Sequence, residues 1–132
     1  MKNNFWVVLL SFLLAASSCS KSEISEKVFR VKILDEVCSN AVVQIQDPAL
    51  YQYGVNGYVN SDSTYDHVFS TRFSCADMAK MQTLTADKKG LVIKIRLIEK
   101  QISEPACSTC AATVPGAPSA FQWVALTEDW SN

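Results

Sequence analysis

The chain has 132 residues, of which 48% are hydrophobic, and its formal net charge is −1 at pH 7. This length suits one domain of ordinary size with a modest hydrophobic core. The lysines and arginines are scattered along the sequence without a basic surplus. The composition therefore shows no electrostatic footprint for nucleic acid, and we expect no nucleic-acid partner.

The first 18 residues have the three parts of a secretory signal. Residues 1–4 are polar and include Lys2, residues 5–16 are almost entirely apolar, and Ser17 and Ser18 are small. The apolar run is about a dozen residues long, whereas a membrane-spanning helix needs roughly 20. We therefore expect residues 1–18 to be a cleaved signal peptide rather than a membrane span.

Cys19 follows these small residues directly. The run Ala-Ser-Ser-Cys at residues 16–19 resembles the lipobox of bacterial lipoproteins, in which the cysteine is acylated, although Ala16 stands where leucine is usual. Lys21 and Glu23, close behind the cysteine, make the segment similar to the tether of Bacteroidota lipoproteins. The resemblance implies a lipid on Cys19, a flexible tether over residues 19–26, and anchoring to the outer membrane of a bacterial envelope, on its periplasmic or its outer face. The alternative is an ordinary signal peptide, cut near Ser18, with no lipid.

Residues 27–132 are expected to form a single small β domain. Residues 28–37 and 41–47 alternate apolar and polar side chains, which is typical of half-buried strands, and the three residues between them predict a tight antiparallel hairpin. Residues 49–66 are expected to be a long hairpin arm or surface loop, with 55–59 as a candidate short strand. Residues 65–69 resume an extended pattern that places Tyr65, His67 and Phe69 on one face.

The apolar period changes over residues 73–84, where one short helix is predicted. Ser74, followed three residues later by Asp77, forms a start like a capping box, and Met78, Met81 and Leu84 form an apolar stripe. Residues 91–98 are the clearest strand in the chain, residues 103–119 are a proline-rich loop, and residues 121–127 predict a final strand.

The predicted order is therefore three strands, a helix and two strands. This is the element order of the OB-fold, a small Greek-key barrel. We expect an all-β fold with one short helix, built as a small five-stranded barrel that is OB-like. A small β-sandwich would give the same order of elements and is the alternative.

Four of the 5 cysteines remain once Cys19 is assigned to the lipid. Disulfides are expected outside the cytoplasm, and four cysteines allow three pairings. We prefer Cys38–Cys75 together with Cys107–Cys110. The C-x-x-C form of the second pair also invites a redox site or a zinc site, but its flanks lack the helix of a thioredoxin-like motif, and no second C-x-x-C completes four zinc ligands. We expect structural bridges and neither a metal nor another cofactor.

The candidate binding residues are the four tyrosines, because a tyrosine offers both an apolar face and a hydroxyl to a sugar or a protein. They are Tyr51, Tyr53, Tyr58 and Tyr65. His67 is the only histidine, and no nucleophile or phosphate-binding motif accompanies it. We therefore predict no catalytic residues and no enzymatic activity.

Together these features predict an envelope-anchored lipoprotein. Its disulfide-stabilised β domain would be a non-enzymatic binding or accessory module for a glycan or an envelope protein. One alternative is a periplasmic thiol–disulfide protein that uses the C-x-x-C pair. Another is a structural protein with no soluble ligand.

Overall fold

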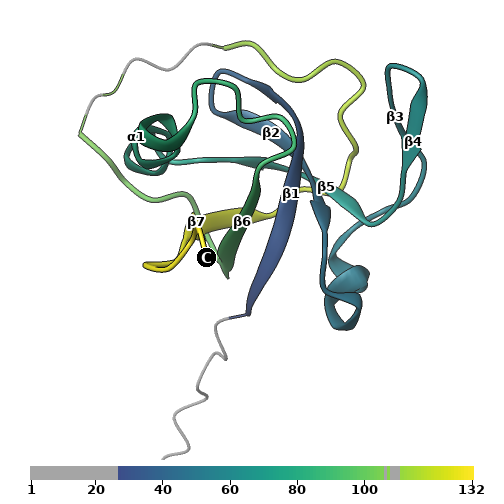
Figure 1. The fold of residues 1–132 in the computed structure, drawn as a ribbon, viewed down its shortest axis with the longest axis horizontal. Coiled ribbons are helices and arrows are strands. Elements are labelled where there is room, and N and C mark those ends of the chain that lie inside the picture. The colour runs from purple at the N-terminus through teal and green to yellow at the C-terminus, as the bar shows by residue number, and fades with distance from the viewer. Residues whose placement is uncertain (1–26, 106, 108–110) are drawn as a thin grey trace, which may run out of the picture.

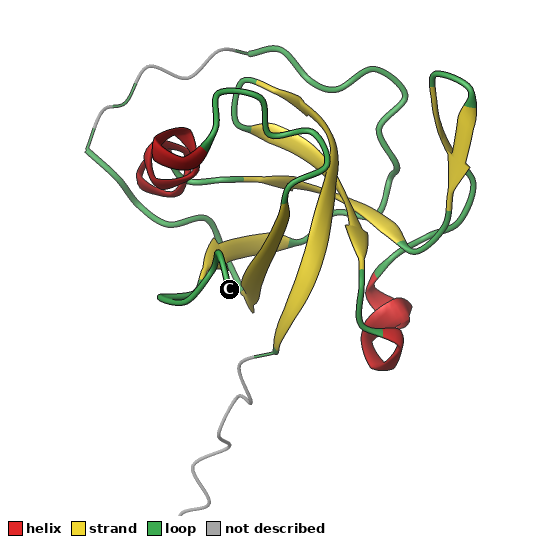
Figure 2. Ribbon diagram, in the orientation of Figure 1, coloured by secondary structure: helices red, strands yellow, loops and turns green. Residues whose placement is uncertain are grey.

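A computed structural model gives the structure of residues 27–105, 107 and 111–132. Within these residues the chain is mostly β with one short α-helix, as expected (Figure 2). In chain order the elements are β1 (Val28–Val37), β2 (Asn40–Ile45), the 3-10 helix η1 (Pro48–Tyr53), β3 (Tyr58–Asn60), β4 (Ser63–Tyr65), β5 (Val68–Arg72), α1 (Cys75–Leu84), β6 (Val92–Ile98) and β7 (Trp123–Leu126).

Five of the strands form one curled sheet with the order β5-β2-β1-β6-β7, in which all neighbours are antiparallel. The two edges of the sheet meet, because Ser70 of β5 forms a parallel bridge with Phe121, just before β7. The amide of Ser70 donates to the Ala120 carbonyl at 2.8 Å, and the amide of Gln122 donates to the Ser70 carbonyl at 3.0 Å. The sheet therefore curls into a small barrel (Figure 1). Along the chain, α1 comes after the barrel strand β5 and before β6, which is the element order of the OB-fold.

Strand β1 is the centre of the sheet and pairs with both β2 and β6. The register between β1 and β2 shifts between Ile33 and Asp35, so that Leu34 is the extra residue of a β-bulge. A bulge increases the local twist and bends the strand, which helps a sheet to curl. The predicted β1–β2 hairpin is confirmed, and Cys38 takes a positive φ of 61° in its turn.

The main core fills the inside of the barrel. Its buried members come from every barrel strand and from the helix: Phe29, Val31, Ile33, Ala41, Val43, Ile45, Phe69, Phe73, Met81, Ile93, Ile95, Val124 and Leu126. The alternation predicted for β1 and β6 therefore points its apolar side chains inward, while Lys94 and Arg96 face out.

Helix α1 begins as predicted, since the Ser74 side chain accepts a hydrogen bond from the Asp77 amide at 3.0 Å. In a full capping box the side chain at position 77 would accept the amide hydrogen of Ser74, but Asp77 instead contacts a residue far away in the sequence. The buried Asp77 carboxylate accepts the amide hydrogen of Leu126 in β7 at 3.1 Å and so ties the helix to the barrel. Met81 is fully buried, but Leu84 is 58% exposed and does not belong to an inward apolar stripe.

The segment between β2 and β5 differs most from the expected elements. It contains η1 and a separate two-stranded hairpin, β3–β4, with the strand at Tyr58–Asn60 rather than at 55–59. His67 has a positive φ of 60°, so the extended pattern predicted for residues 65–69 breaks there and β5 starts at Val68. Phe69 then points into the core while His67 lies outside it.

Candidate functional site

Two of the predicted binding tyrosines anchor the β3–β4 hairpin. Tyr58 and Tyr65 are directly opposite each other in the register of the two strands. Tyr58 is 5% exposed and lies in a second buried cluster with Leu34, Val42, Val68 and Val114, against which Tyr65 packs. Burial raises the pKa of the Tyr58 hydroxyl above its ordinary value, and the neighbouring Asp35 carboxylate raises it further. These two side chains attach the hairpin to the outside of the barrel.

The other two tyrosines lie apart from this pair, on η1. Tyr51 stacks on His67, with ring centroids 3.6 Å apart and planes at 1°. Tyr53 lines a pocket, and the ammonium of Lys27 lies 5.7 Å from the centroid of its ring. The four tyrosines therefore do not form one binding surface.

The β3–β4 hairpin, which we call the arm, stands out from the side of the barrel (Figure 1). Its two strands pair only with each other among the described residues, so both outer edges lack a strand partner. The amide side chain of Asn60 donates to the Leu34 carbonyl at 3.2 Å, and Val55 bridges Val68 at the base of the arm. With these anchors in place, Val59 on β3 is 62% exposed.

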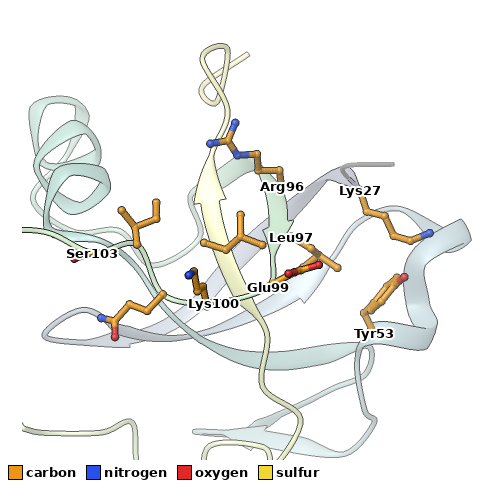
Figure 3. A pocket seen from close by; sticks show the side chains of 10 residues that line it. Lys27, Tyr53, Arg96, Leu97, Glu99, Lys100 and Ser103 are labelled. Carbon is orange, nitrogen blue, oxygen red and sulfur yellow. The ribbon is translucent and has the colours of Figure 1, made fainter. Parts of the chain in front are cut away.

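A pocket with a volume of about 620 Å³ lies where β6 ends. Figure 3 shows Lys27 and Tyr53 on one side of it and Lys100 and Ser103 on the other. Three cations and one carboxylate, that of Glu99, accompany several aliphatic side chains; the lining residues are Lys27, Tyr53, Arg96, Leu97, Ile98, Glu99, Lys100, Gln101, Ile102 and Ser103. Small-molecule sites in proteins have volumes of roughly 300–1,000 Å³ and mix an apolar lining with a few polar groups, so this pocket is of the right size and kind.

The disulfide pairing preferred from the sequence is wrong. Cys75, at the start of α1, is bonded to Cys107, with the two α carbons 6.3 Å apart. Cys38 is disulfide-bonded as well. Because Cys107 is bonded to Cys75, it is not paired with Cys110 as the preferred bridge and the thiol–disulfide alternative require. Cys110 itself lies outside the described residues, as do Cys19 and the predicted signal peptide.

The carboxylate of Glu104 makes a second contact between the same loop and the start of α1. Its two oxygens accept hydrogen bonds from the amides of Cys75 and Ala76, at 2.8 and 3.0 Å. These amides have no partner within the helix, and a negative charge at a helix start is favourable. The hydrogen bonds of Glu104 and the Cys75–Cys107 disulfide together hold the loop after β6 against α1. These two sulfurs and the carboxylate have the spacing of a metal site, but a disulfide sulfur is not the thiolate that binds zinc.

The tyrosines drew attention to η1 and to the arm, but the sequence did not reveal the pocket. Its cations come from two segments, with Lys27 just before β1 and Arg96 and Lys100 in or just after β6, and only the pairing of β1 with β6 brings these segments together. Ile102 is the one signal of the pocket in the sequence, because it is an isoleucine within the otherwise polar residues 99–104. In the structure its side chain is 40% exposed.

Among the described residues, no helix is both long enough and apolar enough to cross a membrane. No protein-family model matches the chain, and neither a curated protein nor a solved structure matches it.

Proposed function

We propose that the chain is a lipid-anchored protein of the bacterial envelope, and that its barrel is a non-enzymatic module that binds an envelope protein through the arm. The observation that carries the binding role is the exposure of Val59, 62%, on a hairpin that Tyr58 anchors to the barrel. The location rests on Cys19 and the residues around it, which resemble a lipobox and tether.

The arm has the properties of a protein-recognition element. An isolated two-stranded hairpin is only marginally stable in water, so the burial of Tyr58 and the Asn60–Leu34 hydrogen bond fix its conformation. A fixed hairpin loses little conformational entropy when it binds. Its unpaired edges can accept a strand from a partner, and Val59 adds an apolar contact beside them.

A protein partner is better supported than a glycan. The glycan hypothesis relied on several tyrosines sharing one surface, with their rings available for stacking on sugars. Tyr58 is buried, and Tyr51 already stacks on His67. The exposed part of the arm offers an aliphatic side chain and strand edges, which suit a polypeptide.

The anchor is tested by labelling growing cells with a radioactive fatty acid. The wild-type chain should take up the label and sediment with the outer membrane. Cys19→Ala should lose the label and accumulate as a precursor of higher mass. A wild-type chain that is exported and stays unlabelled contradicts the proposed anchor.

The arm is tested by placing a photo-crosslinking amino acid at Val59 in otherwise unchanged cells. We expect one discrete crosslinked product that contains a second envelope protein. The matched control is the same amino acid at Leu84, which is 58% exposed on α1 and should give no such product. Equal crosslinking at both positions, or a product that contains only carbohydrate, contradicts the proposal.

A further inference from the structure

Basic side chains gather on the outside of the β1–β6 pair. The sequence contains 12 lysines and arginines, and six of them lie on this face or in the pocket at its end: Lys27, Arg30, Lys32, Lys94, Arg96 and Lys100. Arg30 and Lys94 occupy directly opposite positions of the two strands. Like charges opposite each other destabilise a sheet, so the fold tolerates a cost here.

Only part of this charge is neutralised by the chain itself. The Lys94 ammonium lies 2.5 Å from the Asp129 carboxylate, and the Arg30 guanidinium donates to the Asn132 backbone oxygen at 2.6 Å. In contrast, none of the cations that line the pocket, which are Lys27, Arg96 and Lys100, forms an ion pair with another residue of the described chain.

Apolar side chains are exposed among these unpaired cations. Val28 is 41% exposed directly after Lys27, and Ile102 is 40% exposed in the pocket wall. We call the surface formed by Lys27, Val28, Arg96, Lys100 and Ile102 the basic end. Glu99 also lines the pocket, so these three cations and one carboxylate leave a net charge of +2.

We propose that the basic end rests on the anionic headgroups of the membrane that holds the lipid anchor. Surfaces that lie in a membrane interface combine lysine and arginine with exposed apolar side chains, and each cation near an anionic leaflet strengthens binding. Both kinds of side chain are present here. Solvated glycans or free anions would use the charges but not Val28 and Ile102, so a lipid surface accounts for more of the basic end.

The basic end lies close in sequence to Cys19, which agrees with a barrel whose basic end faces the membrane. This step rests on the lipid anchor proposed above. Residues 20–26 separate Cys19 from Lys27, and such a segment spans at most about 25 Å when fully extended. The basic end therefore cannot move far from an acylated Cys19. Two membrane contacts on one chain reinforce each other, because binding through the lipid anchor raises the local concentration of the basic end at the membrane. The arm, which projects from the side of the barrel, would stay accessible to a partner (Figure 1).

The test uses the mature chain from residue 19 onward with Cys19→Ser, so that no acyl group contributes. The main core begins at Phe29, so the barrel does not require the residues that are removed. Sedimentation is measured with vesicles of phosphatidylcholine alone and with vesicles in which part of this lipid is replaced by phosphatidylglycerol. We expect binding to the anionic vesicles only, with loss of binding at high salt.

Two comparisons, each between a variant of the basic end and a control elsewhere, locate the surface. Lys27→Gln with Lys100→Gln should weaken partition onto the anionic vesicles by about 25-fold, since each basic residue contributes about a fivefold factor. Lys80→Gln with Lys89→Gln removes the same charge from residues that are 55% and 57% exposed elsewhere, and should have a much smaller effect. Ile102→Ser should weaken binding, whereas Leu84→Ser should not.

Equal binding to both kinds of vesicle, no binding to either, or an equal loss in the two lysine pairs overturns the proposal. Saturation by soluble glycerol phosphate without binding to vesicles also overturns it and identifies the basic end as a site for a free anion. Because the chain used is unacylated, these outcomes are independent of fatty-acid labelling at Cys19, which tests the anchor alone.

Discussion

Glu104 and Cys75 are joined by a 2.8 Å hydrogen bond between a carboxylate and the first amide of α1. Three residues further along, Cys107 forms a disulfide with the same Cys75. Two different interactions therefore fix one short stretch of loop to one residue of the helix. The pocket wall, residues 99–103, immediately precedes Glu104, so these interactions also determine where that wall lies.

The disulfide should be a large part of the stability of the chain. It closes a loop with a sequence separation of 32, for which chain entropy predicts about 3–4 kcal/mol of free energy of unfolding. Urea denaturation of Cys75→Ser, Cys107→Ser and the double variant should show this loss. The double variant should be no less stable than either single variant, and additive losses would contradict a bond between these two residues.

Removal of the Glu104 carboxylate should destabilise the helix start. Glu104→Ala leaves two amides without their acceptor, and the expected loss is about 1–2 kcal/mol, the scale found for helix caps. Glu104→Gln keeps one acceptor oxygen and should lose less. Both are measured by urea denaturation, with the exposed Glu128→Ala as the control, which should change the stability by less than about 0.5 kcal/mol.

Asp77 should stabilise the fold through its hydrogen bond to β7 rather than through its own helix. Asp77→Ala leaves the buried amide of Leu126 without an acceptor, which should lower the free energy of unfolding by about 1–3 kcal/mol. Asp77→Asn retains an acceptor oxygen and should lose less. If the alanine variant protects β7 amides from hydrogen exchange as well as the wild type does, the contact does not hold the strand.

Ionisation of Tyr58 should destabilise the fold at alkaline pH. Its pKa is raised in the folded chain, whereas the unfolded chain loses this proton near pH 10. Between the two pKa values the unfolded state binds fewer protons, so stability contributed by neutral Tyr58 is present below about pH 10 and falls as the pH rises. Urea denaturation at increasing pH measures how steeply the free energy of unfolding falls with pH. This fall should be shallower in Tyr58→Phe, and an unchanged fall would contradict the role of Tyr58.

Much of the fold was readable from local patterns. A barrel strand has one face in the core and one in solvent, so Val31 and Ile33 alternate with Arg30 and Lys32 in the sequence as they do in space. The helix start at Ser74 was also local, since a cap and its partner lie three residues apart. These features need no knowledge of distant residues.

The features that were predicted wrongly from the sequence depend on contacts between distant segments. Cysteine spacing cannot show that the loop after β6 lies against α1, where Glu104 contacts the helix start and Cys107 is bonded to Cys75. The pattern over residues 65–69 suggested a continuous strand, but His67 has a left-handed backbone and β5 starts only after it, at Val68. Tyr58 looked like a surface residue because its cover, which includes Val114, comes from a distant loop.

The hydrogen bond between Arg30 and Asn132 places residue 132 beside the first strand. A short linker could therefore join residue 132 to residue 27, and new ends could be opened between Asn60 and Ser63, at the tip of the arm. Such circular permutation is tolerated when the residues joined by the linker lie close together at the surface. All five barrel strands would keep their neighbours, because the cut falls outside the barrel. A permuted chain that folds to the same barrel would show that the arrangement of the strands does not depend on which strand is made first.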